Sequence, residues 1–353
     1  MPNNAWVTLA TNDSYALGAL VLAKSLKSVN TVYPIIVLVT DGVTTAMRDT
    51  LKEVFNNVES VDLYDSKDSE KLSLIKRPEL GVTFTKLCCW KLTSFEKCVF
   101  LDADTLVLHN CDDLFDREEL SAAPDVGWPD CFNSGVFVFV PSNETYSKLI
   151  EYANTNGSFD GGDQGLLNSY FSDWRNLPAR HLPFVYNTSI STAYSYLPAF
   201  KKFEADIKII HFLGSLKPWQ INFNFEQNVV ANLPSEYQHL TKYFSLWWKI
   251  FAESIHPALK PEMSGLAATF ARIKLGEPKQ PDIESWHKGE IDYLGIDSFS
   301  NILQKIEDTM EKKIEKPLES VTSETVPQVE TKPKTSTTSK SSSSKTSTKK
   351  AKK

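Results

Sequence analysis

The segment Cys98–Leu108 reads CVFLDADTLVL: four apolar residues, two aspartates one residue apart, and a second apolar run. In extended backbone the side chains of Asp102 and Asp104 project to the same side. Two carboxylates at the carboxyl end of a parallel strand suit a hard divalent cation, and such a cation stabilises a diphosphate as it leaves. The spacing therefore predicts a metal site, with a pair of aspartates that only cap a turn as the alternative.

Around this segment the chain alternates β-rich runs with helical stretches. Apolar runs predict strands at 6–10, 34–40, 60–64, 98–101, 136–140 and 208–212. Helical patterns fall at 14–29, 45–55, 84–95, 164–171 and, as one long buried helix capped by Ser235, 235–257. Strands separated by such helices imply βαβ units and a mainly parallel α/β sheet of Rossmann-like type, with helices on both faces. Ligands of these sheets bind beyond the carboxyl ends of the strands.

The length of 353 residues allows one large domain or two. With 41% hydrophobic and 23% charged residues, the chain is not disordered as a whole. We expect a large domain over 1–260, a linker over 261–284, a short motif over 285–310 and a disordered Lys/Ser/Thr-rich tail over 311–353.

Charge and composition exclude several classes of partner. Residues 327–353 carry eight lysines and one glutamate, so the net charge of −6 becomes −13 for residues 1–326, which is unsuited to nucleic acid. No run approaches the roughly 20 apolar residues of a membrane span, and the first residues lack the basic region of a signal peptide. The five cysteines are odd in number and include no CxxC pair, which predicts reduced thiols. We therefore expect a cytoplasmic protein.

Seven motifs in a fixed order carry a family resemblance: Asn12-Asp-Ser-Tyr15, Phe84-Thr-Lys-Leu87, Phe100-Leu-Asp-Ala-Asp104, Asn133-Ser-Gly-Val-Phe137, Asp160-Gly-Gly-Asp-Gln-Gly165, Tyr194-Ser-Tyr-Leu-Pro198 and His211-Phe-Leu-Gly-Ser-Leu-Lys-Pro-Trp219. Through them, residues 4–260 resemble the glycogenins, a family of retaining glycosyltransferases of the GT-A fold. The resemblance implies Mn²⁺-dependent transfer of glucose from UDP-glucose to a tyrosine of the chain itself. It further implies extension of that glucose into an α-1,4-glucan and assembly as a homodimer.

His211 ends a predicted strand and is a candidate third metal ligand. A neutral imidazole beside two carboxylates suits Mn²⁺, although a histidine with a purely structural role is the alternative. Lys217, held near the diphosphate by Gly214, would stabilise the departing UDP as a point charge. The resemblance implies the same set, with Asp102, Asp104 and His211 as metal ligands and Lys217 beside them.

Lys86 and two acids are candidates for work on the sugar. Lys86 opens the predicted helix 84–95, where a cation is unfavourable near the positive end of the dipole, so either it has an anionic partner or it is solvated. Asp160 and Asp163 flank Gly161-Gly162, which allows close approach of a ligand, although Asp163 alone would be read as a helix cap. The resemblance implies that both acids face glucose and acceptor, with Asp163 as nucleophile or front-face stabiliser.

The ends of the first strand and of the strand at 136–140 supply further polar residues. The resemblance assigns Thr11, Asn12 and Tyr15 to uridine and ribose, although polar residues at a strand end need no ligand. It assigns Asn133 and Ser134 to the sugar, although Asn-Ser-Gly is also ordinary turn chemistry. The substrate-binding set implied by the resemblance is Leu9, Thr11, Asn12, Tyr15, Arg77, Lys86, Asp102, Ala103, Asp104, Asn133, Ser134, Asp160, Asp163, Gln164, His211, Gly214 and Lys217.

The resemblance places the glucosylated residue at Tyr194. A phenol has a pKa near 10, so at neutral pH it needs a base, which Asp163 or a donor phosphate oxygen would provide. Tyr196 would share the same face of an extended stretch and is the alternative acceptor. The segment Trp286–Glu307, with an amphipathic helix after Ser298, resembles the glycogen-synthase-binding motif of the family. A helix that folds back onto the chain's own domain is the alternative.

The sequence is also compatible with other functions. A hydrophobic strand before Asp102-Ala-Asp104 fits a haloacid-dehalogenase-like phosphatase with Asp102 as nucleophile, but Thr105 then comes one position early. A related glycosyltransferase with an external acceptor would carry the same metal and sugar residues. A non-enzymatic scaffold that recruits glycogen synthase would need only the segment Trp286–Glu307.

Overall fold

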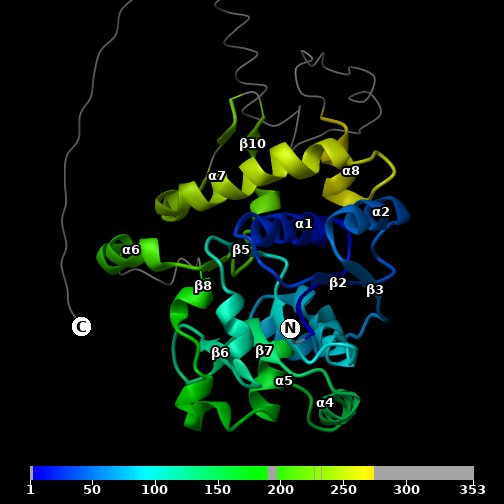
Figure 1. Cartoon of the computed structure of the whole chain (residues 1–353), viewed down its shortest axis with the longest axis vertical. Coiled ribbons are helices and arrows are strands. Elements are labelled where there is room, and N and C mark those ends of the chain that lie inside the picture. Colours follow the sequence, from blue (N-terminus) through cyan, green and yellow to red (C-terminus); the bar gives the residue numbers. More distant parts are fainter. Residues whose placement is uncertain (1–2, 190–196, 226, 232, 274–353) are drawn as a thin grey trace, which may run out of the picture. The chain divides into compact units, whose positions relative to one another are not determined.

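A six-stranded sheet forms the centre of the computed structural model, which describes residues 3–189, 197–225, 227–231 and 233–273 (Figure 1). Its strand order is β3-β2-β1-β4-β7-β6. The first four strands run parallel, whereas β7 is antiparallel to β4 and β6 to β7. The predicted α/β fold is confirmed, with a mixed sheet. The strands are β1 Asn4–Ala10, β2 Ile35–Val39, β3 Asn57–Ser60, β4 Lys97–Leu101, β6 Ser121–Pro124 and β7 Phe132–Phe139.

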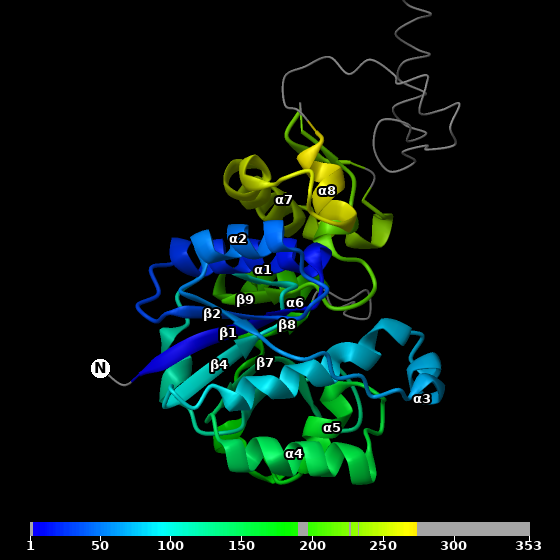
Figure 2. The same cartoon turned by 90° about the vertical axis from the view of Figure 1, so that its right-hand side faces the viewer.

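Helices cover both faces of this sheet, because successive side chains of its central strands alternate between two apolar cores. On β1, Trp6 and Ala10 belong to one core and Ala5 and Val7 to the other. Figure 2 shows α1 and α2 on one side of the sheet, with α7 and α8 beyond α1, and α4 and α5 on the other side. The α-helices are α1 Asp13–Ser28, α2 Thr45–Val54, α3 Ser69–Leu74, α4 Asn143–Asn156, α5 Asp163–Tyr170, α6 Leu197–Phe203, α7 Thr241–Ile250 and α8 Gly265–Ala271.

Tighter and wider helical turns fill many connections. The 3₁₀ segments are η1 Pro78–Lys91, η2 Asp112–Asp116, η3 Trp174–Asn176, η4 Pro178–Arg180, η5 Phe184–Tyr186, η6 Glu204–Asp206, η7 Pro218–Gln220, η8 Ser235–Leu240 and η10 His256–Ala258, and η9 Phe251–Ile255 is a π-helix.

A three-stranded sheet of order β5-β9-β8 lies beside the central sheet and is essential to the site. It consists of β5 Thr105–Val107, β8 Thr188–Ser189 and β9 Ile209–His211. Strand β5 pairs antiparallel with β9, in a register that sets Thr105 opposite His211. Residues about 100 positions apart in sequence are thereby brought together next to Asp104. A two-stranded ribbon, β10 Phe223–Asn224 with β11 Val229–Val230, completes the strands that the structure describes.

Several predicted boundaries are wrong. The third strand is 57–60 rather than 60–64. The helix expected at 84–95 is the 3₁₀ segment η1, which begins at Pro78, a residue suited to a first helical turn. The long helix expected over 235–257 is divided into η8, α7, η9 and η10. Ser235, expected as its N-cap, is instead the first residue of η8, and no side chain caps this segment.

The predicted linker 261–284 contains helix α8, which packs against α1. Its N-cap residue Ser264 donates from its backbone N–H to Asp13 Oδ2 over 2.6 Å, and Asp13 also accepts from the backbone N–H and hydroxyl of Thr44. This fully buried carboxylate joins α1, α2 and α8, so the ordered body extends past residue 260. None of the helices in the described ranges combines the length and the apolar character that a membrane span requires.

Candidate active site

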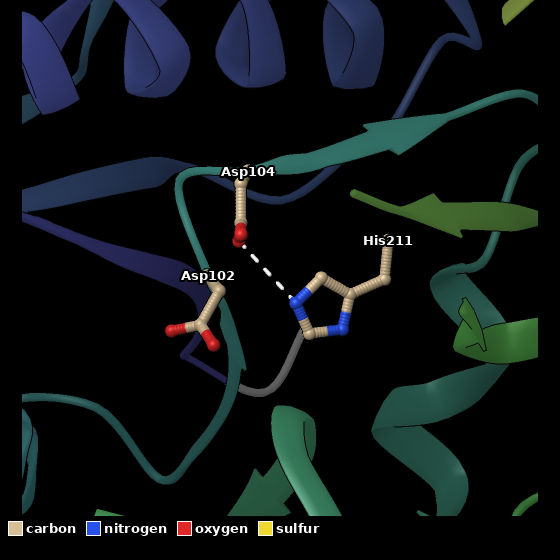
Figure 3. Close-up of side chains that lie close together, drawn as sticks. All are labelled: Asp102, Asp104 and His211. Carbon is tan, nitrogen blue, oxygen red and sulfur yellow. Dashed lines mark ion pairs between the residues drawn. The ribbon is translucent and has the colours of Figure 1, made fainter. Parts of the chain in front are cut away.

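Asp102, Asp104 and His211 converge at the carboxyl end of β4, and one ligand atom from each lies within 4.8 Å of the others (Figure 3). His211 Nε2 is 3.3 Å from Asp104 Oδ1. His211 Nδ1 lies 2.9 Å from Asn187 Oδ1, whereas the buried Nε2 makes no hydrogen bond within the described ranges. A neutral ring that donates from Nδ1 presents a lone pair at Nε2, so this donor set fits Mn²⁺.

The prediction that the two aspartates lie in extended backbone is wrong. They lie at either end of a turn. Thr105 donates to the carbonyl oxygen of Asp102 over 3.0 Å from its backbone N–H and over 2.7 Å from its hydroxyl. A glycine on α1 allows this turn to lie close to the helix, because a Cβ at Gly18 would be 2.5 Å from the carbonyl oxygen of Ala103. The turn thus brings the two carboxylates together, and the β5–β9 pairing adds His211 to them.

Lys217 faces the metal-ligand cluster. Its Nζ forms an ion pair with Asp104 Oδ2 and donates to the carbonyl oxygen of Phe212 over 3.1 Å. Gly214 has a φ of +108°, a conformation that favours glycine, and it turns the chain between β9 and Lys217. Burial alone would raise the pKa of Asp104, but the ammonium of Lys217 beside it holds that pKa well below its usual range. Asp104 therefore stays an ionised ligand at all physiological pH values.

Lys86 joins the metal-ligand cluster to Asp163 of α5. Its ammonium lies 3.0 Å from Asp102 Oδ1, 2.6 Å from Asp163 Oδ2 and 3.1 Å from the carbonyl oxygen of Ser134. The expected anionic partners exist, but the predicted position at a helix start is wrong, because Lys86 is in the middle of η1. Burial disfavours its charge, yet Asp102 and Asp163 raise the pKa of Lys86 above its ordinary value.

The acids before and within α5 have different environments. Asp163 is the first residue of the helix, and the N-cap is Gly162, so the capping alternative is wrong. Asp160 accepts hydrogen bonds from the hydroxyl of Ser158 over 2.7 Å and from Gly162 N–H over 2.9 Å. Burial raises the pKa of Asp160. Lys86 therefore fixes Asp163 relative to the metal ligands, while Asp160 is held by its own loop.

A group of amides lies next to the metal-ligand cluster. Asn133 Nδ2 donates to Gln164 Oε1 over 3.1 Å, and the backbone N–H of Ser134 donates to the same oxygen over 3.2 Å. The predicted sugar-binding residues Asn133, Ser134 and Gln164 are thus brought together. Asp125, which sequence reasoning missed, accepts from Gln164 Nε2 over 2.6 Å and from Asn133 Nδ2 over 3.3 Å.

Asn187 is the second residue that sequence reasoning missed. It is buried between His211 and Asn133, and its Nδ2 donates to Asn133 Oδ1 over 2.8 Å. In the sequence it belongs to Asn187-Thr-Ser, which by itself indicates only a glycosylation sequon. Nothing in the sequence places it beside His211, because the contact depends on β8 lying next to β9.

The residues expected at the uridine end are partly brought to the cluster. Asn12 caps α1 by accepting from Tyr15 N–H over 3.1 Å. Burial, together with the charge of Asp104, raises the pKa of Tyr15 to about 12, and Arg77 acts on it in the opposite direction. Thr11 uses its carbonyl oxygen to accept from the hydroxyl of Thr40 over 2.7 Å. Leu9, from the substrate-binding set that the resemblance implies, packs against the apolar core on the η1 side.

The five cysteines, all within the described ranges, are free, as predicted, and four of them are buried. Burial raises the pKa of Cys98 and of Cys111 to about 12, which keeps both as inert thiols. Tyr194, Tyr196 and the segment Trp286–Glu307 lie outside the described residues.

A mixed α/β sheet with an aspartate pair at the carboxyl end of a central strand, and a histidine brought to it by β9, is the arrangement expected of a glycosyltransferase of the GT-A fold. Comparison with known proteins agrees: the chain matches glycosyl transferase family 8 over residues 6–119 and 116–222. It is 49% identical over 330 residues to glycogenin-1 of Mus musculus, covering 87% of this chain and 99% of that protein. It is 51% identical over 268 residues to glycogenin-2 of Homo sapiens, covering 75% of this chain and 54% of that protein. The chain therefore belongs to glycosyl transferase family 8 and, within it, to the glycogenins.

Membership of this family makes the phosphatase and non-enzymatic scaffold hypotheses wrong. Among solved structures, the chain is similar to the apo form of the glycosyltransferase GlyE of Streptococcus pneumoniae TIGR4, with 22% identity and a TM-score of 0.47, covering 71% of this chain and 62% of that one. A likeness of that size adds nothing to the assignment.

Proposed function

We propose that this protein transfers glucose from UDP-glucose, in the presence of Mn²⁺, to Tyr194 of its own chain and then extends that glucose into an α-1,4-glucan primer. The observation that carries the proposal is the convergence of Asp102, Asp104 and His211 beside Lys217 in a chain of the glycogenin family. Carboxylate oxygens and an imidazole nitrogen are ligands that Mn²⁺ accepts.

The geometry supports separate tasks for the two buried lysines. Asp102, Asp104 and His211 would hold Mn²⁺, which when bound neutralises the diphosphate that leaves as UDP. Lys217, adjacent to Asp104, would place a second positive charge on the same diphosphate. Lys86, paired with both Asp102 and Asp163, would hold the sugar-side carboxylate at a fixed distance from the metal ligands.

Asp163 is the carboxylate that we assign to the reacting face of the glucose, as nucleophile or front-face stabiliser, and Asp160 to its hydroxyls. The amides of Asn133 and Gln164 with the backbone of Ser134 would complete the sugar site, since all three are joined by hydrogen bonds next to these acids. Leu9, Thr11, Asn12, Tyr15, Arg77, Ala103 and Gly214 complete the proposed nucleotide-sugar site.

We further assign two protein partners, glycogen synthase and a second copy of this chain. The family supports glycogen synthase, bound through Trp286–Glu307, as the enzyme that takes over the glucan, and it supports a homodimer in which one subunit reaches the tyrosine of the other. A cytoplasmic location fits the free cysteines of the described body.

The experiment is incubation of the full chain with UDP-glucose and Mn²⁺, followed by intact-mass measurement and peptide mapping. The proposal requires the mass to rise in hexose steps and the label to map to Tyr194. An unchanged mass with UDP release onto added maltoside would mean that the acceptor is an external sugar. An unchanged mass with no UDP release would overturn the donor assignment.

A further inference from the structure

The imidazole of His211 can serve as a metal ligand only if the correct ring nitrogen is free. Neutral histidine carries its proton on one nitrogen and a lone pair on the other, and the hydrogen bond of the first sets which is which. Here Nδ1 faces Asn187 Oδ1 at 2.9 Å and Nε2 faces Asp104. The orientation of the Asn187 amide therefore decides whether Nε2 offers a lone pair.

That orientation is fixed by a backbone group that lies two amides away. The backbone N–H of Gly135 donates to Asn133 Oδ1 over 3.0 Å, and a backbone N–H can only donate. Asn133 must therefore present its oxygen at this point. Asn187 Nδ2 donates to the same oxygen over 2.8 Å, so Asn187 turns its own oxygen toward His211. His211 must then donate from Nδ1.

The other end of Asn133 is also held. Its Nδ2 lies 3.1 Å from Gln164 Oε1 and 3.3 Å from Asp125 Oδ2, both acceptors in this arrangement. A second backbone donor, the N–H of Ser134, fixes Gln164 Oε1 as an acceptor. Rotating the Asn133 amide would place N–H against N–H and oxygen against oxygen, away from water that could compensate.

Burial and packing make the arrangement rigid. The exposed fractions of Asn133, Asn187 and His211 are 5%, 2% and 1%. The ring also lies directly against the backbone, because a Cβ at Gly135 would be 2.2 Å from His211 Cε1 and 2.7 Å from Nδ1. Gly135 thus provides both the space for the His211 ring and the N–H donor that orients the two amides.

We propose that Asn187 and Asn133 are positioning residues. Their two amides form a hydrogen-bonded relay from the Gly135 N–H to His211, which fixes the proton of the ring on Nδ1. The Nε2 lone pair then faces the metal position beside Asp102 and Asp104. This inference rests on the proposed Mn²⁺ site. Neither amide needs to touch the metal, yet the affinity for the metal depends on both.

The tautomer is measured on the full chain with ¹⁵N-labelled histidine, metal-free and at mildly alkaline pH, where a free imidazole is neutral. The relay predicts that His211, assigned by its absence in His211→Gln, shows a protonated Nδ1 and a bare Nε2. A neutral His211 ring with its proton on Nε2 overturns the relay, whatever the metal does.

Affinity is measured by the loss of the free Mn²⁺ signal in electron paramagnetic resonance. Asn187→Leu, which is close in size but cannot accept, should weaken Mn²⁺ binding roughly tenfold to a hundredfold, as loss of a group that orients a ligand does. Asn187→Asp retains an acceptor for Nδ1–H and should bind within about threefold of wild type. Asn4→Leu, which removes a buried amide at the start of β1, is the matched control.

The outcomes separate the two claims. If wild type does not bind Mn²⁺, the proposed function is wrong, and the ring spectrum still decides the tautomer. If wild type and Asn187→Leu bind Mn²⁺ equally, the relay is wrong and the metal site stands. If Asn187→Leu does not fold, the wild-type spectrum decides alone.

Discussion

Replacement of Lys86 by methionine tests the link between the metal ligands and the sugar-side acids. The Lys86 side chain is 4% exposed and that of Asp163 8%, whereas that of Asp102 is 30% exposed. Removing one partner of a buried ion pair costs about 3–5 kcal/mol. Since water screens Asp102, the pair with Asp163 dominates, and we expect a loss near the lower limit, about 3 kcal/mol.

That loss corresponds to a fall in melting temperature of about 6–12 °C at roughly 2–4 °C per kcal/mol. The sign of its pH dependence follows from the ionisation states. The raised pKa of Lys86 means that its contribution is complete below the ordinary lysine pKa and is lost only at strongly alkaline pH. Burial already raises the pKa of Asp102, so in the variant this carboxylate takes up a proton as the pH falls, and the difference from wild type should shrink in acid.

The assay is urea unfolding followed by tryptophan fluorescence at neutral and acid pH. Lys52→Met removes an exposed lysine, 64% accessible and paired with Asp49, and should change stability by less than about 0.5 kcal/mol. If Lys86→Met loses less than about 1 kcal/mol at neutral pH, the link is not a buried ion pair of the kind that costs several kcal/mol to break. An equal loss in acid would contradict the assigned ionisation states.

Three further predictions concern the ligands and the acceptor. Asp104→Asn should abolish transfer but retain the fold; because the pKa of Asp104 is lowered, its stabilising contribution is lost as the pH falls below about 4, and acid titration of unfolding should be shallower in the variant. Tyr194→Phe should prevent self-labelling, but the variant should still glucosylate added maltoside in a mass assay. Continued labelling of the variant at Tyr196 would mean that Tyr196 and not Tyr194 is the acceptor. Gly135→Ala should force His211 aside, cost about 1–3 kcal/mol in thermal unfolding and weaken Mn²⁺ binding; wild-type binding would contradict this packing.

Much of the fold was predictable because its signals are local. The apolar runs of β1, β2 and β4 are long enough to be buried on both faces, and helices of the expected length lie between them. The role of the aspartate pair as candidate metal ligands is predictable because the pair directly follows β4 in the sequence. The antiparallel strand β7 reads like a parallel one, since both are continuous apolar runs, and only the pairing distinguishes them.

The rest depends on contacts between distant segments. Asn187 reaches His211 only because β8 and β9 are neighbours, and Asn133 lies 54 positions from the Asn187 amide that it orients. The sequence pattern places Lys86 at a helix start, whereas Pro78, eight positions earlier, begins the segment. The residues of helix α8 read as a linker because the stretch around them is poor in periodically spaced apolar residues, and the hydrogen bond from Ser264 to the buried Asp13, which holds the start of the helix on α1, joins segments far apart in sequence.

The central claim is that Asp102, Asp104 and His211 hold one divalent cation against the leaving diphosphate. A crystal grown with UDP and Mn²⁺ tests it most directly, because manganese is located by its anomalous scattering. We expect one peak bonded to carboxylate oxygens of both aspartates and to His211 Nε2, with Lys217 turned to the phosphates. A manganese peak elsewhere, or a peak without Nε2 among its ligands, would contradict the account.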